Sequence, residues 1–449
     1  MIGSKKINDI LKQVLKASPA DQTEVMLIAH DSQLTRFANN YIHQNVAETN
    51  AILNVRAVMG KRQGVATTNN LSAEGVKRAV ETAHLSASRQ PEDPDFHGLT
   101  ESPPSQSVPA LDEQTAEYSP EKRASAIDII CSKAKEKSIN GSGYFKTGTF
   151  ETAVANSLGT MDYHAGTVSD VSVTAMTDDS AGRAQASAWK VNELDPETIG
   201  DDAIDKAYRG RNPRKIDPGE YTVVVEPYVT EDLVVMLAWI GMSATAVQDE
   251  RSWMNDRMGK QVMSPLVTIW DDGNDPAGCP LPFDCEGVPK QRVGIVEKGV
   301  VSSPVYDTYT ARKEGRQSTG HATPLSFDVE PYPFNLFMAG GESTVEEMIR
   351  STERGLYIAT FWYTRPMHPR DAVFTGMTRD GVFMIENGEI TYPVKNLRFT
   401  QSYVEALSNV EMVGNGTRCL VSEFNQGVKL AACVPALKIG AFNFTGTTI

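Results

Sequence analysis

The chain has 449 residues, of which 40% are apolar and 22% are charged, and its formal net charge is −14. A chain of this length exceeds what one hydrophobic core usually organises, so we expect two domains. The negative charge argues against a nucleic-acid-binding surface, because phosphate binding depends on Lys and Arg.

Neither a membrane span nor an export signal is indicated. The longest nearly uninterrupted apolar run, residues 233–242, is shorter than the roughly twenty residues that cross a bilayer. The first residues lead directly into an amphipathic pattern without an apolar signal segment. The cysteines are few, scattered and odd in number, which favours reduced thiols: Cys131, Cys279, Cys285, Cys419 and Cys433. We therefore expect a cytoplasmic protein.

The N-terminal region begins with a helical pattern followed by strand patterns. An opening helix is predicted by the spacing of Ile7, Ile10, Leu11, Val14 and Leu15. Residues 25–29, 34–39 and 51–58 are rich in strand-forming side chains. Ser72 is placed to cap a second helix, whose apolar face holds Val76, Ala79, Val80 and Ala83.

Residues 90–118 interrupt these patterns with prolines among acidic and small polar residues: Pro91, Pro94, Pro103, Pro104 and Pro109. This composition is too poor in apolar groups to pack well, so we expect a solvent-exposed excursion. The same order of elements then recurs. Ser119 and Pro120 begin a helix, strands follow between residues 144 and 191, and another helix lies near residues 199–208. The shared pattern predicts two similar halves, each helix, strands, helix.

A junction is predicted at residues 209–219, which combine Gly, Pro and clustered charges. It divides the chain into an N-terminal α/β-mixed domain, residues 1–215, and a C-terminal domain, residues 216–449. A strand at residues 221–226 precedes the apolar run, and Thr230 is expected to cap that helix. Glu231 and Asp232 would then lie in its first turn and complement the helix dipole.

The rest of the C-terminal region is chiefly β in pattern. Lys298-Gly299 and Asn387-Gly388 lie between strand-like segments and favour hairpin turns. Residues 344–354 are the one stretch there that is expected to be helical. The fold class predicted is α+β, with a mainly antiparallel β C-terminal domain.

Four short segments in one order resemble the TldD/PmbA family: residues 36–44, Asp284-Cys285-Glu286-Gly287-Val288-Pro289, residues 318–322 and residues 385–390. The resemblance spans nearly the whole chain. It implies metal-dependent peptidase activity, and the family also carries the name of a modulator of DNA gyrase. The charge of the chain disfavours direct DNA binding.

The chain departs from the metal-binding members of that family at every expected ligand. Those members carry a His-Glu-x-x-x-His motif on the helix before these segments, yet residues 165–320 contain no histidine. Their further cysteine ligand is also missing, because the comparable stretch, residues 362–369, has no cysteine. The resemblance therefore points to the PmbA branch, also called TldE. It implies a subunit that binds no metal itself and pairs with a TldD-like partner that carries zinc, or forms a homodimer when alone.

The residue types in the C-terminal region allow two other hypotheses, a metal site and a nucleophilic triad. Cys279, Cys285, Asp284, Glu286, His321 and His368 could converge on a metal, although their spacing does not match zinc knuckles. Ser318, His321 and Asp284 supply the side chains of a nucleophilic triad. No Gly-x-Ser-x-Gly turn is present, however, and the alternative is a tight turn whose hydroxyls bind local backbone groups.

Asp284 and Glu286 form a candidate acid and base pair. Alternation along a strand would place both on one face, with Cys285 opposite. They would line a cavity shared with a partner subunit, alongside Arg292 and His321. The alternative is an ion pair with Arg292 or Lys290 that fixes the loop.

Phe361, Trp362 and Tyr363, followed by Arg365, His368 and Arg370, form an aromatic and cationic cluster. Such a cluster suits an extended peptide or its terminal carboxylate, but a core strand that ends in a solvated loop has the same pattern. The candidate substrate-binding residues are thus Asp284, Glu286, Arg292, His321, Arg365 and His368.

The leading hypothesis is a non-catalytic, metal-free subunit of a TldD/TldE-like peptidase that acts on unfolded or short peptides. Two rivals stay open. One is a stand-alone homodimeric peptidase with an unrecognised metal site, and the other is a non-catalytic peptide-binding or scaffold protein.

Overall fold

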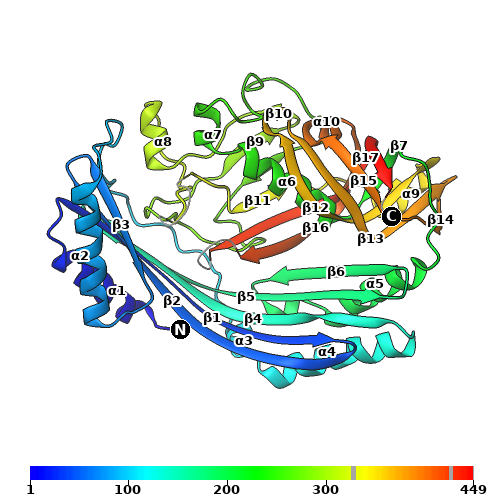
Figure 1. The fold of residues 1–449 in the computed structure, drawn as a ribbon, viewed down its shortest axis with the longest axis horizontal. Coiled ribbons are helices and arrows are strands. Elements are labelled where there is room, and N and C mark those ends of the chain that lie inside the picture. Colours follow the sequence, from blue (N-terminus) through cyan, green and yellow to red (C-terminus); the bar gives the residue numbers. More distant parts are fainter. Residues whose placement is uncertain (325–329, 424–427, 448–449) are drawn as a thin grey trace.

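Two β-sheets stacked on one another organise the protein in the computed structural model, which describes residues 1–324, 330–423 and 428–447 (Figure 1). The N-terminal sheet is antiparallel throughout, in the order β3-β2-β1-β4-β5-β6. Its elements are α1 (Ser4–Ala17), β1 (Gln22–Ala38), β2 (Tyr41–Met59), β3 (Arg62–Thr68), α2 (Ala73–Arg89), α3 (Glu113–Ala116), α4 (Pro120–Glu136), β4 (Asn140–Asn156), β5 (Met161–Met176), β6 (Ala181–Ala188), η1 (Val191–Glu193) and α5 (Pro196–Arg209).

The order helix, three strands, helix occurs twice in this sheet, first from α1 to α2 and then from α4 to α5. The two sets join where β1 pairs with β4. Alternation along β1 explains the layering. Val25 and Leu27 pack with α1 and α2, whereas Met26 and Ile28 point the other way and pack with Phe283 of the C-terminal domain. One face of the sheet is therefore covered by helices and the other by the second domain.

The C-terminal sheet is mixed. Its order is β10-β9-β8-β11-β17-β15-β13-β12-β7, with β14 paired to β13 and β16 to β17. Most pairs are antiparallel, but β11 with β17 and β7 with β12 run parallel. The elements are β7 (Gly219–Val225), α6 (Pro227–Gly241), α7 (Ala244–Gln248), β8 (Ile269–Asp271), β9 (Val293–Glu297), β10 (Val300–Val301), α8 (Thr308–Lys313), β11 (Asn335–Met338), α9 (Val345–Arg350), β12 (Arg354–His368), η2 (Pro369–Asp371), β13 (Val373–Glu386), β14 (Glu389–Pro393), β15 (Leu397–Ser402), α10 (Tyr403–Ser408), β16 (Val410–Glu423) and β17 (Lys429–Thr447).

The α+β fold class is confirmed, and so are the predicted hairpin turns. Lys298 and Gly299 join β9 to β10 with φ of 48° and 81°, and Asn387 and Gly388 join β13 to β14 with φ of 53° and 80°. Two consecutive positive φ angles define the turn type that matches the twist of a hairpin. The helix expected over residues 344–354 is shorter, because α9 ends at Arg350 and Arg354 already begins β12.

The proline-rich segment is attached more firmly than its composition predicts. Many residues of 90–118 are exposed, but Phe96 and Leu99 are each only 5% exposed and pack against Val58. Arg312 of α8 donates hydrogen bonds to the carbonyls of Gly98 and Leu99. Two well-spaced apolar side chains and backbone hydrogen bonds thus hold this segment against both domains.

Cys419 and Cys433 correct the expectation of reduced thiols. They lie opposite each other on β16 and β17 and form a disulfide bond. Cys131, Cys279 and Cys285 are free thiols, as expected, and the structure shows that all three are buried. Strand register, which cysteine spacing does not reveal, brings the pair together. No helix in the described part of the chain is long and apolar enough to span a membrane.

Candidate functional site

Helix α6 packs against β12 and β17, and the hydroxyl of Tyr228 in its first turn is hydrogen-bonded to the backbone of Gln185 in β6 of the N-terminal sheet. The helix begins earlier than predicted. Its first residue is Pro227 and its N-cap is Glu226, so Thr230 is inside the helix and caps nothing. Proline suits the first helical position because its φ is fixed and its missing N–H would have no partner there. Glu231 and Asp232 consequently lie in the second turn rather than the first, where they face a cavity.

This cavity, which we call the α6 cavity, has a volume of about 680 Å³. Strands β1, β4, β5 and β6 of the N-terminal sheet form one wall, and α6, β12 and β16 form the other. Its lining residues are Leu34, Arg36, Tyr144, Lys146, Val168, Asp170, Arg183, Gln185, Tyr228, Glu231, Asp232, Met236, Thr360, Phe361, Trp362, Tyr363, Thr364, Arg365, Leu420, Val421, Ser422 and Lys429.

The two carboxyl groups of α6 have raised pKa values. Burial, reinforced by the charge of Asp232, raises the pKa of Glu231 to about 7, although Arg183 opposes the shift. Burial raises the pKa of Asp232 to about 6, against a hydrogen bond of 2.6 Å from the Tyr403 hydroxyl. Glu231 makes no hydrogen bond or ion pair with the described residues, so its carboxyl group is available to a ligand and can exchange a proton near neutral pH.

Only part of the aromatic and cationic cluster of β12 lines this cavity. Phe361 is buried, whereas Trp362 and Tyr363 are 45% and 65% exposed at the cavity. The Arg365 guanidinium lies 4.6 Å from the centre of the Tyr363 ring, and Arg365 also lines the cavity. His368 is exposed and is not among the lining residues.

The motif that contains Asp284 and Glu286 forms a turn, not the strand that alternation predicted. Asp284 Oδ1 accepts hydrogen bonds from the backbone N–H groups of Glu286 and Val288, and Oδ2 accepts one from Ala322. Burial and the nearby charge of Glu286 raise the pKa of Asp284. Because its side chain holds the turn, Asp284 and Glu286 do not form one face of a strand.

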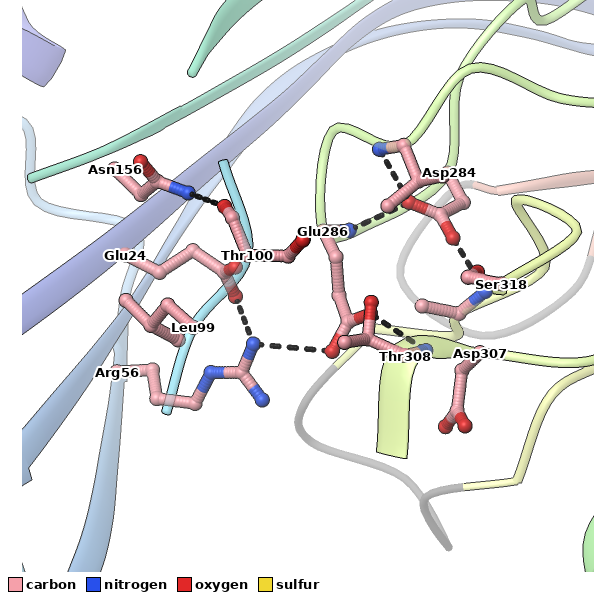
Figure 2. Close-up of polar contacts among 12 residues, drawn as sticks. Glu24, Arg56, Leu99, Thr100, Asn156, Asp284, Glu286, Asp307, Thr308 and Ser318 are labelled. Carbon is pink, nitrogen blue, oxygen red and sulfur yellow. Dashed lines mark hydrogen bonds and ion pairs between the residues drawn. The ribbon is translucent and has the colours of Figure 1, made fainter. Parts of the chain in front are cut away.

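Glu286 joins the two domains instead of pairing within its loop. The Arg56 guanidinium of β2 contacts Glu24 of β1 at 2.7 Å and Glu286 at 3.3 Å (Figure 2). The second oxygen of Glu286 accepts a hydrogen bond from the backbone N–H of Thr308. The partner expected from the sequence was Arg292 or Lys290, but Arg292 is half-exposed, 3.8 Å from Glu297. We call Glu24, Arg56 and Glu286 the interdomain ion triad.

His321 is fully buried and serves the fold. Its Nε2 lies 2.8 Å from Asp271 Oδ1 and its Nδ1 2.9 Å from the Thr319 hydroxyl. Burial is the main cause that lowers its pKa. Ser318 donates to the Tyr306 carbonyl and accepts from the Gly320 N–H, as the turn interpretation predicted. Ser318, His321 and Asp284 therefore do not form a catalytic triad.

Three family models together match most of the chain. The PmbA/TldA metallopeptidase domain 1 matches residues 23–87, the PmbA/TldA metallopeptidase central domain matches 109–211, and the PmbA/TldA metallopeptidase C-terminal domain matches 218–446. The last model alone covers more than half of the chain. The chain belongs to the PmbA/TldD family. The resemblance seen in its short motifs is thus confirmed.

Related family members are similar over different lengths. Metalloprotease PmbA of Escherichia coli O157:H7 is 25% identical over 367 residues, 79% of this chain and 78% of that protein. A PmbA homolog from Haemophilus influenzae is 26% identical over 395 residues, 83% of each chain. A TldD homolog from the same organism is 29% identical over 215 residues, so the match spans only 46% of this chain and 44% of that relative.

Solved structures share the whole fold of this PmbA/TldD protein. TldE from Thermococcus kodakarensis superposes with a TM-score of 0.88 at 20% identity, covering 98% of this chain and 100% of that one. A Thermotoga maritima protein that bears the name of a DNA gyrase modulator gives a TM-score of 0.84 at 21% identity, with the same coverage. At 20% and 21% identity, both comparisons show a shared fold and nothing further.

The family name implies a metal, which the α6 cavity of this member does not fit. Zinc in proteins prefers imidazole and thiolate ligands, and the described lining residues include neither histidine nor cysteine. The cavity carboxylates lie among cationic side chains: Arg36, Lys146, Arg183, Arg365 and Lys429. Across the described ranges, no group of three or more His, Cys, Asp and Glu residues is arranged to hold a metal ion.

The predicted substrate-binding residues are thus spread over several places. Asp284, Glu286 and His321 lie in neighbouring buried loops, Arg365 lines the α6 cavity, and Arg292 and His368 lie on the surface. The N-terminal wall of the cavity, including Arg36 and Asp170, was not predicted, because strand patterns do not show which face meets a second domain. One signal was present, since two acids in an otherwise apolar helix need an explanation, and the dipole interpretation of Glu231 and Asp232 hid it.

Proposed function

We propose that this chain is the metal-free subunit of a heteromeric peptidase. It pairs with a TldD-like subunit that carries zinc and activates the attacking water, and the complex acts on unfolded or short peptides. This chain contributes the α6 cavity as a binding surface for part of the peptide. We further propose that the complex is cytoplasmic.

The observation that carries the proposal is the chemistry of α6. The helix presents Tyr228, Glu231, Asp232 and Met236 to the cavity, and none of these side chains is an imidazole or a thiolate. Similarity to PmbA and to a TldE structure supports the assignment to the partner subunit rather than to the zinc-bearing one.

Several features of the cavity suit a peptide. Trp362 and Tyr363 offer flat apolar faces beside the Arg365 guanidinium, which can pair with a carboxylate. Glu231 and Asp232, on α6 in the same wall of the cavity, can accept the N–H groups of a peptide or its terminal amine. Of the residues chosen from the sequence, we assign Arg365 a direct contact with the peptide, and we assign Asp284, Glu286 and His321 to holding the fold.

The test is to purify the chain alone and together with a co-expressed TldD-like subunit, and to measure zinc content and cleavage of a labelled unfolded peptide. We expect zinc and cleavage only in the complex. A complex whose TldD-like subunit lacks its histidine ligands is the control and should retain assembly but lose both signals. Stoichiometric zinc together with metal-dependent cleavage by the pure chain would refute the proposal.

A further inference from the structure

The α6 cavity has an excess of positive charge, although the chain as a whole carries a net charge of −14. Its lining contains three arginines and two lysines but only three carboxyl residues. The arginines come from both walls: Arg36 and Arg183 from β1 and β6, and Arg365 from β12. A cavity lined mainly by one sign of charge concentrates ligands of the opposite sign, so the α6 cavity attracts anionic groups.

These three arginines have no carboxylate partner among the described residues. Each guanidinium donates instead to a neutral oxygen: Arg36 to Gln44 Oε1 at 3.4 Å, Arg183 to Gln185 Oε1 at 2.9 Å, and Arg365 to the preceding backbone carbonyl at 2.8 Å. Arg36 and Arg365 are exposed and Arg183 is half-buried, so a ligand can reach all three. A guanidinium has more N–H donors than these bonds use, and its planar fork matches a carboxylate.

The carboxyl groups of the lining leave this positive charge largely in place. Asp170 Oδ1 accepts hydrogen bonds from the Ser187 hydroxyl at 2.6 Å and from Gln185 at 3.1 Å, so Asp170 is engaged within its own sheet. Glu231, whose pKa is about 7, carries only part of a negative charge at neutral pH. Arg183 opposes the rise of that pKa without forming an ion pair with Glu231 in the described part of the chain. A carboxylate brought by a ligand therefore meets guanidiniums that are not already neutralised.

The register of the N-terminal sheet sets the spacing of Arg36 and Arg183. Arg36 on β1 lies opposite Tyr144 on β4, Tyr144 lies opposite Ser172 on β5, and Ser172 lies opposite Gln185 on β6. Arg183 is two residues from Gln185 along β6. Neighbouring strands are about 4.8 Å apart and a strand rises about 3.3 Å per residue, so the two arginine Cα atoms are separated by about 15 Å. An extended peptide covers that distance in roughly four or five residues.

We propose that the α6 cavity selects acidic peptides. Asp or Glu side chains of the bound segment pair with Arg36 and Arg183 on the N-terminal wall and with Arg365 on the C-terminal wall. This inference rests on the proposed function, because it takes the α6 cavity as the peptide site, and it adds the substrate class.

A matched set of labelled peptides of about eight residues tests the preference. The peptides differ only at two positions about four residues apart, which hold Glu, Gln or Lys. Fluorescence anisotropy measures their affinity for the full chain and for its complex with a TldD-like subunit. We expect the Glu peptide to bind about tenfold more tightly than the Gln peptide, and the Lys peptide to bind most weakly, because the guanidiniums attract the first and repel the last. Raising the salt concentration from about 50 mM to about 500 mM should reduce the preference, since accessible charge pairs are screened.

Two variants locate the acidic side chains. Arg36→Gln and Arg183→Gln should each reduce the preference for the Glu peptide over the Gln peptide about threefold, because each removes one charge and keeps a polar side chain. Binding of the Gln peptide should stay the same in both variants, which also shows that the cavity is still folded. The matched control is Arg398→Gln at an exposed position on β15 outside the cavity lining, which should leave both affinities unchanged.

The outcomes separate this inference from the proposed function. A preference for the Glu peptide that falls in Arg36→Gln and Arg183→Gln supports the inference. Equal binding of the Glu and Gln peptides, or a preference that both variants leave intact, would overturn the acidic substrate class while the peptide site stands. Failure of every peptide to bind would overturn both. Stronger displacement of the Glu peptide by an oligonucleotide than by unlabelled Glu peptide would also overturn the inference, because the cavity would then be a phosphate site.

Discussion

The α6 cavity and the interdomain ion triad both lie between the two domains, but their buried carboxyl groups differ in whether they have a cationic partner. In the triad, the carboxylates of Glu24 and Glu286 share one buried guanidinium. In the α6 cavity, Glu231 has no hydrogen-bonding partner among the described residues and a pKa raised to about 7. The charges of the triad are paired within the chain, whereas the carboxyl group of Glu231 has no such partner among the described residues.

The comparison shows that the most recognisable sequence motif and the residues that line the α6 cavity lie in different parts of the protein. The motif with Asp284 and Glu286 is the most recognisable part of the chain, and its side chains hold a turn and join two domains. The cavity is built from single residues on strands of both domains. In this protein the recognisable motif stabilises the fold, whereas the side chains that a ligand can reach are identified only from the three-dimensional structure.

The largest expected effect is on the triad. Arg56→Met should lower the free energy of unfolding by about 3–5 kcal/mol, because two buried carboxylates lose their shared cation. Urea denaturation measures the change. Arg292→Met is the matched control, and its free energy of unfolding should stay within about 0.5 kcal/mol of the wild type. Arg292 is half-exposed, and its ion pair with Glu297, at 3.8 Å, is open to solvent and therefore weak. If Arg56→Met costs less than about 1 kcal/mol, the triad does not hold the domains together.

A smaller effect is expected from Glu231. Its pKa of about 7 in the folded protein lies above the ordinary glutamate value of 4.5. The folded protein therefore binds more protons between these pH values and loses stability as pH rises through them. After a discount for partial exposure, the loss is on the order of 2 kcal/mol. Glu231→Gln should remove it.

Urea denaturation of the wild type and Glu231→Gln at pH 5 and pH 7.5 tests this expectation. The variant should show the flatter pH dependence, and Glu297→Gln, at a half-exposed position, should follow the wild type. A variant as pH-dependent as the wild type would mean that Glu231 titrates normally, and the contrast with the triad would then disappear.

The parts of the fold that depend on local pattern were predictable. Apolar spacing located α1, and the Asn387-Gly388 pair located a hairpin, because each depends on a few neighbouring residues. Long-range pairing was not predictable. The Cys419–Cys433 bond and the parallel pairing of β7 with β12 depend on register between distant strands.

The site was predictable in part for the same reason. Aromatic and cationic residues of β12 were recognised as a candidate peptide surface, and residues 360–365 line the α6 cavity. The partner of Glu286 was assigned wrongly because Arg56 is 230 positions away in sequence and belongs to the other domain. Arg292 and Lys290 are close to Glu286 in sequence, but the packing of the two domains determines that Arg56 is its cationic partner.

The smallest expected effect concerns peptide binding in the α6 cavity. Trp362→Ala and Arg365→Ala should each weaken binding of a labelled unfolded peptide about fivefold, since one removes an exposed aromatic face and the other a cationic donor. Fluorescence anisotropy measures the affinity of the chain and of its complex with a TldD-like subunit. His368→Ala is the informative control, because His368 lies on the same strand but outside the cavity lining. Equal loss in His368→Ala would place the peptide along the outer part of β12 and not in the cavity, and the triad would remain the better-defined of the two regions.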